Sequence, residues 1–134
     1  MVKVVLLEDS KILREIYKFS LEDKGFSVME IDDGKDLENV LKENNIDIIL
    51  SDTHLITIDG PDAVKSAYNK SLLGNETLVI GMSDDPDSRK LWKGLAHYDC
   101  FYDKGDYPRK EMGEKVLNCW NAFNSGIPGW RMKL

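Results

Sequence analysis

Short apolar runs alternate along the chain with segments in which apolar residues recur every three or four positions. The apolar runs predict five strands, over residues 3–7, 26–31, 46–50, 78–82 and 100–102. Three of these runs, the first, third and fourth, are almost entirely aliphatic, as expected for strands covered on both faces. Strands that alternate with helices are typical of βα units. We therefore expect an α/β fold, a doubly wound five-stranded parallel sheet with helices on both faces.

The segments between and after the runs predict five helices. They are expected over residues 12–21, 37–44, 61–68, from residue 86 onward, and 107–123. A basic residue and a glycine, Lys24 and Gly25, supply the stop signal of the first helix, and Pro61 suits the first turn of the third. Two glycines and a proline follow the last helix. We expect one domain over residues 1–124 and a C-terminal tail over residues 125–134.

The composition limits the classes of function. The chain has 134 residues, 42% of them hydrophobic, which is enough for one sizeable core. With a net charge of −6, the chain lacks the excess of basic residues that binding to a nucleic-acid phosphate backbone requires. We therefore expect no direct nucleic-acid binding. The first apolar run is too short for a signal peptide or a membrane span, which predicts a cytoplasmic protein without membrane insertion. Its two cysteines lie in apolar stretches and are expected to be reduced core thiols.

Polar residues stand where the predicted strands end. They are Glu8 and Asp9 after the first strand, Asp52 after the third, Ser83 after the fourth and Lys104 just beyond the fifth. The carboxyl ends of parallel strands lie on one rim of a sheet, where ligands of such folds bind. These residues are far apart in the sequence, yet the fold could bring them together.

Three crowded carboxylates would repel one another unless a cation held them, and Mg²⁺ or Mn²⁺ suits a partly open oxygen site. Phosphoryl transfer needs a nucleophile, a cation and neutralisation of charge on the transferred group. Asp52 could be the nucleophile, with Glu8 and Asp9 as metal ligands. Ser83 could then donate a hydroxyl to a phosphoryl oxygen and Lys104 supply a positive charge. Each residue alone is ordinary for a loop or surface, but together they favour one site.

Residues 3–123 resemble the response-regulator receiver family, whose members carry an acidic pair, a phosphoacceptor Asp, a Ser or Thr and a Lys at these four strand ends. The segment DTHLITIDG, residues 52–60, also matches the family's spacing from phosphoacceptor to Asp59-Gly60. The resemblance implies a flavodoxin-like sheet of order 2-1-3-4-5. It also implies the backbone carbonyl of His54 as a metal ligand and Phe101 as the switch aromatic residue.

Several residues depart from the family pattern near the predicted site. Ile56 and Gly105 stand where the family often has Pro, so the rigidity of these loops could differ. Asp84 follows Ser83 at a position that is normally Ala or Gly, where a carboxylate could repel an incoming phosphoryl group. His54, two residues after the phosphoacceptor position, could modulate loss of the phosphoryl group or could be a solvent-facing loop residue.

The resemblance implies a single-domain response regulator of a two-component phosphorelay. Asp52 would accept a phosphoryl group from a sensor histidine kinase or phosphotransfer protein in a Mg²⁺-dependent reaction. Such a protein is no enzyme for a separate substrate, although it assists its own phosphorylation and dephosphorylation. Its phosphoryl group would draw Ser83 inward and let Phe101 rotate into the vacated space, which would change the surface offered to a downstream protein target.

Three alternatives remain open at this point. Asp84 favours a pseudo-receiver, a protein-interaction module that acts without phosphorylation. A haloacid-dehalogenase-like phosphatase is disfavoured because His54 stands where those enzymes have an acid/base Asp. An FMN-binding protein is disfavoured because the loop after Leu7 is acidic and lacks a hydroxyl-rich phosphate cradle.

Overall fold

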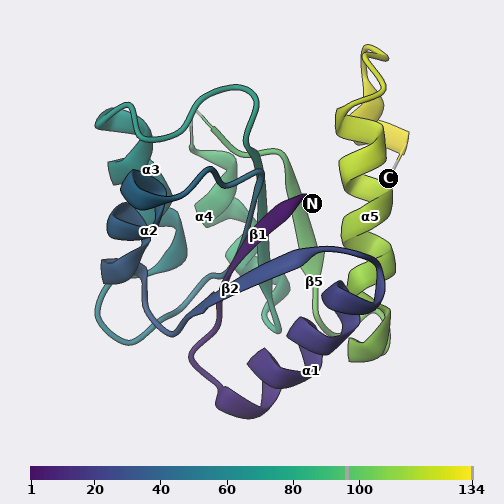
Figure 1. Ribbon diagram of the computed structural model, residues 1–134, viewed down its shortest axis with the longest axis horizontal. Coiled ribbons are helices and arrows are strands. Elements are labelled where there is room, and N and C mark those ends of the chain that lie inside the picture. Colours follow the sequence, from purple (N-terminus) through teal and green to yellow (C-terminus); the bar gives the residue numbers. More distant parts are fainter. Residues whose placement is uncertain (96, 134) are drawn as a thin grey trace.

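The computed structural model describes residues 1–95 and 97–133 of the chain (Figure 1). Five parallel strands form one sheet in the order β2-β1-β3-β4-β5, which confirms the predicted fold class. The strands are β1 (Lys3–Leu7), β2 (Ser27–Ile31), β3 (Ile48–Asp52), β4 (Leu78–Ser83) and β5 (Cys100–Asp103). Because the order reverses between β1 and β3, the switch point of the sheet lies at the carboxyl ends of these two strands.

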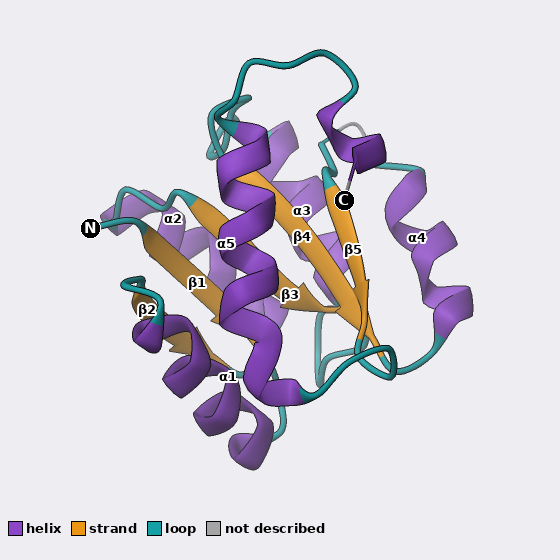
Figure 2. Cartoon of the chain, turned by 90° about the vertical axis from the view of Figure 1, so that its right-hand side faces the viewer, coloured by secondary structure: helices purple, strands orange, loops and turns teal. Residues whose placement is uncertain are grey.

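Helices cover both faces of the sheet, with α1 and α5 on one face and α2, α3 and α4 on the other (Figures 1 and 2). The α-helices are α1 (Lys11–Asp23), α2 (Leu37–Glu43), α3 (Gly60–Asn69), α4 (Arg89–Lys93) and α5 (Met112–Phe123). Short 3₁₀ turns are η1 (Gly34–Asp36), η2 (Pro86–Ser88), η3 (Arg109–Glu111) and η4 (Trp130–Lys133). Within the described ranges, none of these helices has the length and apolar character needed to cross a membrane.

The aliphatic strands are buried from both sides because successive side chains of a strand point to opposite faces. Val4 and Leu6 of β1 pack in the core beneath α1 and α5. Their neighbours Val5 and Leu7 pack in the second core beneath α2, α3 and α4. Full burial of such a side chain stabilises the fold by about 1.5–3 kcal/mol. This two-sided burial is why β1, β3 and β4 read as continuous apolar runs.

Helix α4 is anchored to the domain by its buried residue, Trp92. The Trp92 side chain is completely buried, and its indole Nε1 donates a hydrogen bond of 2.8 Å to Thr53 Oγ1. A Cβ atom at Gly81 of β4 would lie only 2.5 Å from the indole ring, so glycine makes room for it. The indole thus joins α4 both to the sheet and to the residue that follows Asp52.

The segment predicted as a tail folds against the domain. Trp130 in η4 packs edge-to-face on Phe123 of α5, with ring centroids 5.7 Å apart. Arg131 forms an ion pair with Asp99, a buried residue that precedes β5. Residue 134 lies outside the described residues. These two contacts hold Trp130 and Arg131 against α5 and the start of β5.

The two cysteines, Cys100 and Cys119, are buried and free, as expected for reduced core thiols.

Candidate functional site

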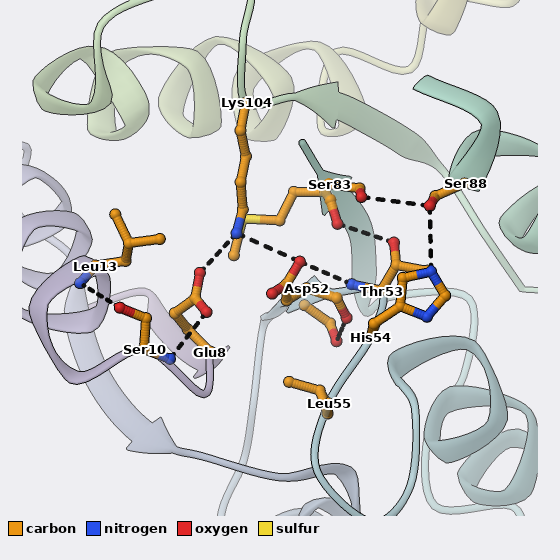
Figure 3. Close-up of polar contacts among 12 residues, drawn as sticks. Glu8, Ser10, Leu13, Asp52, Thr53, His54, Leu55, Ser83, Ser88 and Lys104 are labelled. Carbon is orange, nitrogen blue, oxygen red and sulfur yellow. Dashed lines mark hydrogen bonds and ion pairs between the residues drawn. The ribbon is translucent and has the colours of Figure 1, made fainter. Parts of the chain in front are cut away.

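The predicted acidic residues meet at the carboxyl ends of β1 and β3, where Glu8 and Asp52 lie close together (Figure 3). Glu8, Asp9 and Asp52 each offer a carboxylate oxygen, and these atoms all lie within 4.8 Å of one another. Glu8 is buried, Asp52 is partly exposed and Asp9 is exposed, so the cluster opens to solvent on one side. Oxygen ligands beside open coordination positions suit Mg²⁺, which keeps several waters when it binds proteins.

Lys104 lies against the same carboxylates. Its Nζ is 2.7 Å from Glu8 Oε1 and 3.3 Å from Asp52 Oδ1, and its side chain is 2% exposed. Burial alone would lower the pKa of Lys104, but the charges of Asp52 and Glu8 raise it, which keeps the ammonium group charged. The sequence assigned Lys104 to the transferred phosphoryl group. In this structure the Lys104 ammonium group instead pairs with the carboxylates of Glu8 and Asp52.

The carboxyl groups themselves are perturbed. Burial raises the pKa of Glu8 to about 7, an effect that Asp52 adds to and that Lys104 partly offsets. Burial also raises the pKa of Asp52, again against the influence of Lys104. A divalent cation would lower both pKa values, because a nearby positive charge favours the ionised form. One lysine therefore leaves this pocket short of positive charge.

The start of α1 fixes the acidic pair. Ser10 caps α1 by accepting a hydrogen bond of 3.3 Å from the backbone N–H of Leu13. The Ser10 backbone N–H donates to Glu8 Oε2 at 3.2 Å, and the Arg14 guanidinium donates to the Glu8 carbonyl at 2.8 Å. These contacts hold the Glu8 carboxylate beneath the rim while the chain turns from β1 into α1.

Thr53, a residue that the sequence did not single out, fixes the chain directly after Asp52. Its backbone N–H donates to Asp52 Oδ1 at 3.0 Å. Its buried hydroxyl donates to the Met82 carbonyl at 2.9 Å and accepts the Trp92 indole N–H. The side chain therefore connects β3, β4 and α4 at the point where the candidate phosphoacceptor stands.

Asp33, also missed from the sequence, holds the loop between β3 and α3. Its buried Oδ1 accepts backbone N–H groups of Thr57 at 2.7 Å and Ile58 at 3.3 Å, and Oδ2 accepts that of Lys35 at 3.2 Å. Burial alone would raise the pKa of Asp33, but these donors lower it. The loop is thus tied down although Ile56 replaces the usual Pro.

Ser83 lies at the end of β4 with its hydroxyl directed toward Ser88 (Figure 3). The hydroxyl donates to Ser88 Oγ at 3.3 Å and accepts the backbone N–H of Asp85 at 3.1 Å. No hydrogen bond among residues 1–95 and 97–133 joins Ser83 to Asp52. The hydroxyl predicted to bind a phosphoryl oxygen is therefore engaged elsewhere in this conformation.

The two predicted modulators differ in their surroundings. His54 Nε2 lies 3.5 Å from Ser88 Oγ, and its Nδ1 lies 3.7 Å from Asp59 Oδ2, although most of the side chain is exposed. Asp84 is exposed, and its carboxylate forms no hydrogen bond or ion pair with any described residue. The backbone carbonyl of His54 as a metal ligand stays a prediction.

Phe101 does not start from the exposed position that the expected inward rotation requires. The residue is 7% exposed, and the Arg89 guanidinium carbon lies 5.0 Å from the centroid of its ring. It packs within the core beneath α2, α3 and α4. Because the ring is already almost fully buried in this structure, a rotation on phosphorylation would have little exposed surface left to remove. A role of Phe101 in switching stays a prediction.

A doubly wound sheet with an acidic cluster, a hydroxyl and a buried lysine at its carboxyl rim defines a signalling domain of the receiver type. The model of the response regulator receiver domain family matches residues 4–97, and the chain belongs to this family, the receiver domains of two-component signalling. The match ends before Phe101 and Lys104, so the assignment of those residues rests on the geometry above.

Solved structures agree on the fold. The chain is similar to the chemotaxis response regulator CheY4 of Vibrio cholerae, with a TM-score of 0.76 and 20% identity over 89% of this chain and 98% of that one. It is also similar to the receiver domain of the hybrid histidine kinase CckA, with a TM-score of 0.69 and 26% identity over 88% of this chain and 98% of that one.

Curated relatives include larger sensor proteins. The chain is 22% identical over 89 residues to the CAI-1 autoinducer sensor kinase/phosphatase CqsS of Vibrio cholerae, a match that covers 66% of this chain and 13% of that protein. It is 24% identical over 88 residues to the autoinducer 1 sensor kinase/phosphatase LuxN of Vibrio campbellii, covering 66% of this chain and 10% of that protein. The matched region is thus about a tenth of the length of these relatives.

Proposed function

We propose that this receiver domain is a phosphoacceptor in a two-component phosphorelay, with Asp52 as the site of phosphorylation. The observation that carries the proposal is the grouping of Asp52 with Glu8 and Asp9 within 4.8 Å and with Lys104 at 3.3 Å. A carboxylate nucleophile, further metal ligands and a buried cation are the parts that phosphoryl transfer needs.

The proposed reaction joins an Asp52 carboxylate oxygen to the phosphorus of a phosphohistidine. The bond between phosphorus and the imidazole nitrogen breaks, and the leaving imidazole takes up a proton. A Mg²⁺ or Mn²⁺ ion held by Glu8, Asp9, Asp52 and the His54 carbonyl would neutralise charge on the transferred group. Lys104 would pair with a phosphoryl oxygen once Asp52 carries the phosphoryl group, and water would later hydrolyse the acyl phosphate.

The partners follow from this chemistry. We propose a sensor histidine kinase or phosphotransfer protein as donor and a downstream protein as target, with no direct binding of nucleic acid, in agreement with the net charge of −6. We place the receiver at residues 1–124, with segment 125–134 beyond it, and propose that it acts in the cytoplasm.

Helix α1 offers a surface on which the donor could dock. Ile12, Ile16 and Phe19 are exposed and lie at positions i, i+4 and i+7, which is one face of the helix. This apolar stripe starts three residues after Asp9, at the rim that carries the site. A donor whose own helix packs on the stripe would bring its phosphohistidine to the open side of the acidic cluster.

Phosphorylation is tested by intact-mass measurement after incubation with a small phosphodonor and Mg²⁺. The expected result is an adduct of one phosphoryl group that requires Mg²⁺ and is lost in base, as an acyl phosphate is. Asp52→Asn should abolish the adduct, because an amide is a poor nucleophile.

Asp84→Ala tests whether the carboxylate beside Ser83, at a position that is normally Ala or Gly in the family, slows phosphorylation. Since Asp84 is exposed, the variant is expected to label no more than about tenfold faster than the wild type, the effect of a screened charge near the site. Absence of any adduct, under conditions that phosphorylate a control receiver, would favour the pseudo-receiver. Labelling only in Asp84→Ala would identify this carboxylate as the obstruction.

A further inference from the structure

The hydroxyl of Ser83 cannot donate a hydrogen bond to a phosphoryl group on Asp52 while it donates to Ser88. A hydroxyl has one proton to donate, and in this structure that proton is directed to Ser88 Oγ at 3.3 Å. Both residues are buried, Ser83 at 5% and Ser88 at 2% exposure, so water does not easily replace the bond. Any approach of Ser83 to the phosphoryl group must therefore break its contact with Ser88.

Ser88 does not act as the helix cap that its position before α4 suggests. It stands directly before α4, where a serine hydroxyl usually accepts a backbone N–H of the first turn. Here its side chain makes no capping hydrogen bond. The Ser88 hydroxyl instead bridges Ser83 and His54, two residues that flank the candidate site on β4 and on the loop after β3 (Figure 3).

We propose that Ser88 is a positioning residue that holds the Ser83 hydroxyl away from Asp52 and so opposes switching. The inference rests on the proposed function, because Ser83 acquires a second partner only when a phosphoryl group is present. Phosphorylation exchanges the Ser83–Ser88 hydrogen bond for one to a phosphoryl oxygen, and it frees Ser88 at the start of α4. The bond from the Asp85 N–H to Ser83 is shared by wild type and Ser88 variants, so it cancels in their comparison.

Ser88→Ala should make a phosphoryl mimic bind more tightly. In the variant, the buried Ser83 hydroxyl has no acceptor at position 88, so turning toward the mimic costs less. From the net free-energy contribution of a neutral hydrogen bond, we expect the affinity for beryllofluoride in the presence of Mg²⁺ to rise about two- to tenfold. Binding is measured by NMR titration of the wild-type chain and the variant.

A double-mutant cycle separates this role from a merely structural one. In a Ser83→Ala background, Ser88→Ala should leave beryllofluoride affinity unchanged, because no hydroxyl remains to be released. Ser66→Ala is the matched control. Ser66 lies on α3, outside the acidic cluster, and its hydroxyl donates to Glu38 of α2 at 2.6 Å. Its replacement should not alter beryllofluoride affinity in either background.

The outcomes are distinct. Tighter binding in Ser88→Ala that disappears in the Ser83→Ala background supports the proposal. Unchanged or weaker binding in Ser88→Ala, or an equal gain in both backgrounds, overturns it while leaving the proposed function intact. A wild-type chain that binds Mg²⁺ but no beryllofluoride would overturn the proposed function, and the inference with it.

Discussion

Replacing Trp92 with alanine is expected to lower the free energy of unfolding by about 3–5 kcal/mol, the usual cost of removing a large aromatic side chain from a core. Trp92 is the largest of the completely buried side chains. It fills the space above Gly81, and helix α4 has only five residues with which to compensate. A loss of this size is a large fraction of the stability of an ordinary domain, about 5–15 kcal/mol.

Urea unfolding followed by circular dichroism measures this effect, with Trp120→Ala as the matched control. Trp120 lies on α5, is only half-buried and stacks on Phe123, so the same substitution there should cost clearly less. Trp92→Phe should fall between the two, since it keeps most of the ring but leaves Thr53 without the indole donor. Equal losses in Trp92→Ala and Trp120→Ala would show that Trp92 does not anchor α4.

Replacing Asp9 with alanine is expected to weaken Mg²⁺ binding at least about tenfold, because even groups outside the ligand shell commonly contribute that much. Asp9 is the exposed member of the acidic cluster, so its loss should remove a ligand oxygen without damaging the core. Its removal also relieves repulsion of Asp52, since the Asp9 charge helps to raise the Asp52 pKa. Folding should therefore be unharmed while metal affinity falls.

NMR titration with Mg²⁺ tests this expectation, read from the indole N–H of Trp92, which donates to the residue next to Asp52. Asp23→Ala removes the same charge from an exposed position at the other end of α1 and should leave affinity nearly unchanged. If Asp9→Ala binds Mg²⁺ as tightly as Asp23→Ala, the ion does not occupy the proposed cluster.

The sheet could be predicted from the sequence because burial on both faces leaves an unmistakable aliphatic run, as in Ile48–Asp52 and Leu78–Ser83. Helix α4 could be placed only by its start near Pro86. A helix of five residues shows too few turns for an apolar period, so nothing in the pattern told whether Trp92 faced the core or solvent. Trp130 lies in η4, a turn of only four residues, so its packing on Phe123 could not be predicted from an apolar period either.

The acidic cluster could be predicted because the topology of a parallel sheet, and no detail of side-chain geometry, brings strand ends together. The supporting residues could not. Thr53, Asp33 and Ser88 are single polar residues in or beside loops, where such residues are common and follow no period. The buried pair of Glu8 and Lys104 joins positions 96 residues apart, and the inward position of Phe101 depends on a rotamer. Neither is encoded in spacing.

The proposed function requires that the phosphoryl group forms on Asp52, and chemical trapping can locate it. Borohydride reduces an aspartyl phosphate to homoserine, and peptide mass spectrometry then locates the changed residue. After incubation with a small phosphodonor and Mg²⁺, we expect homoserine at position 52 alone, and none when Mg²⁺ is left out. Homoserine at position 9 or 84, or an unreduced chain after a confirmed reaction of a control receiver, would contradict it.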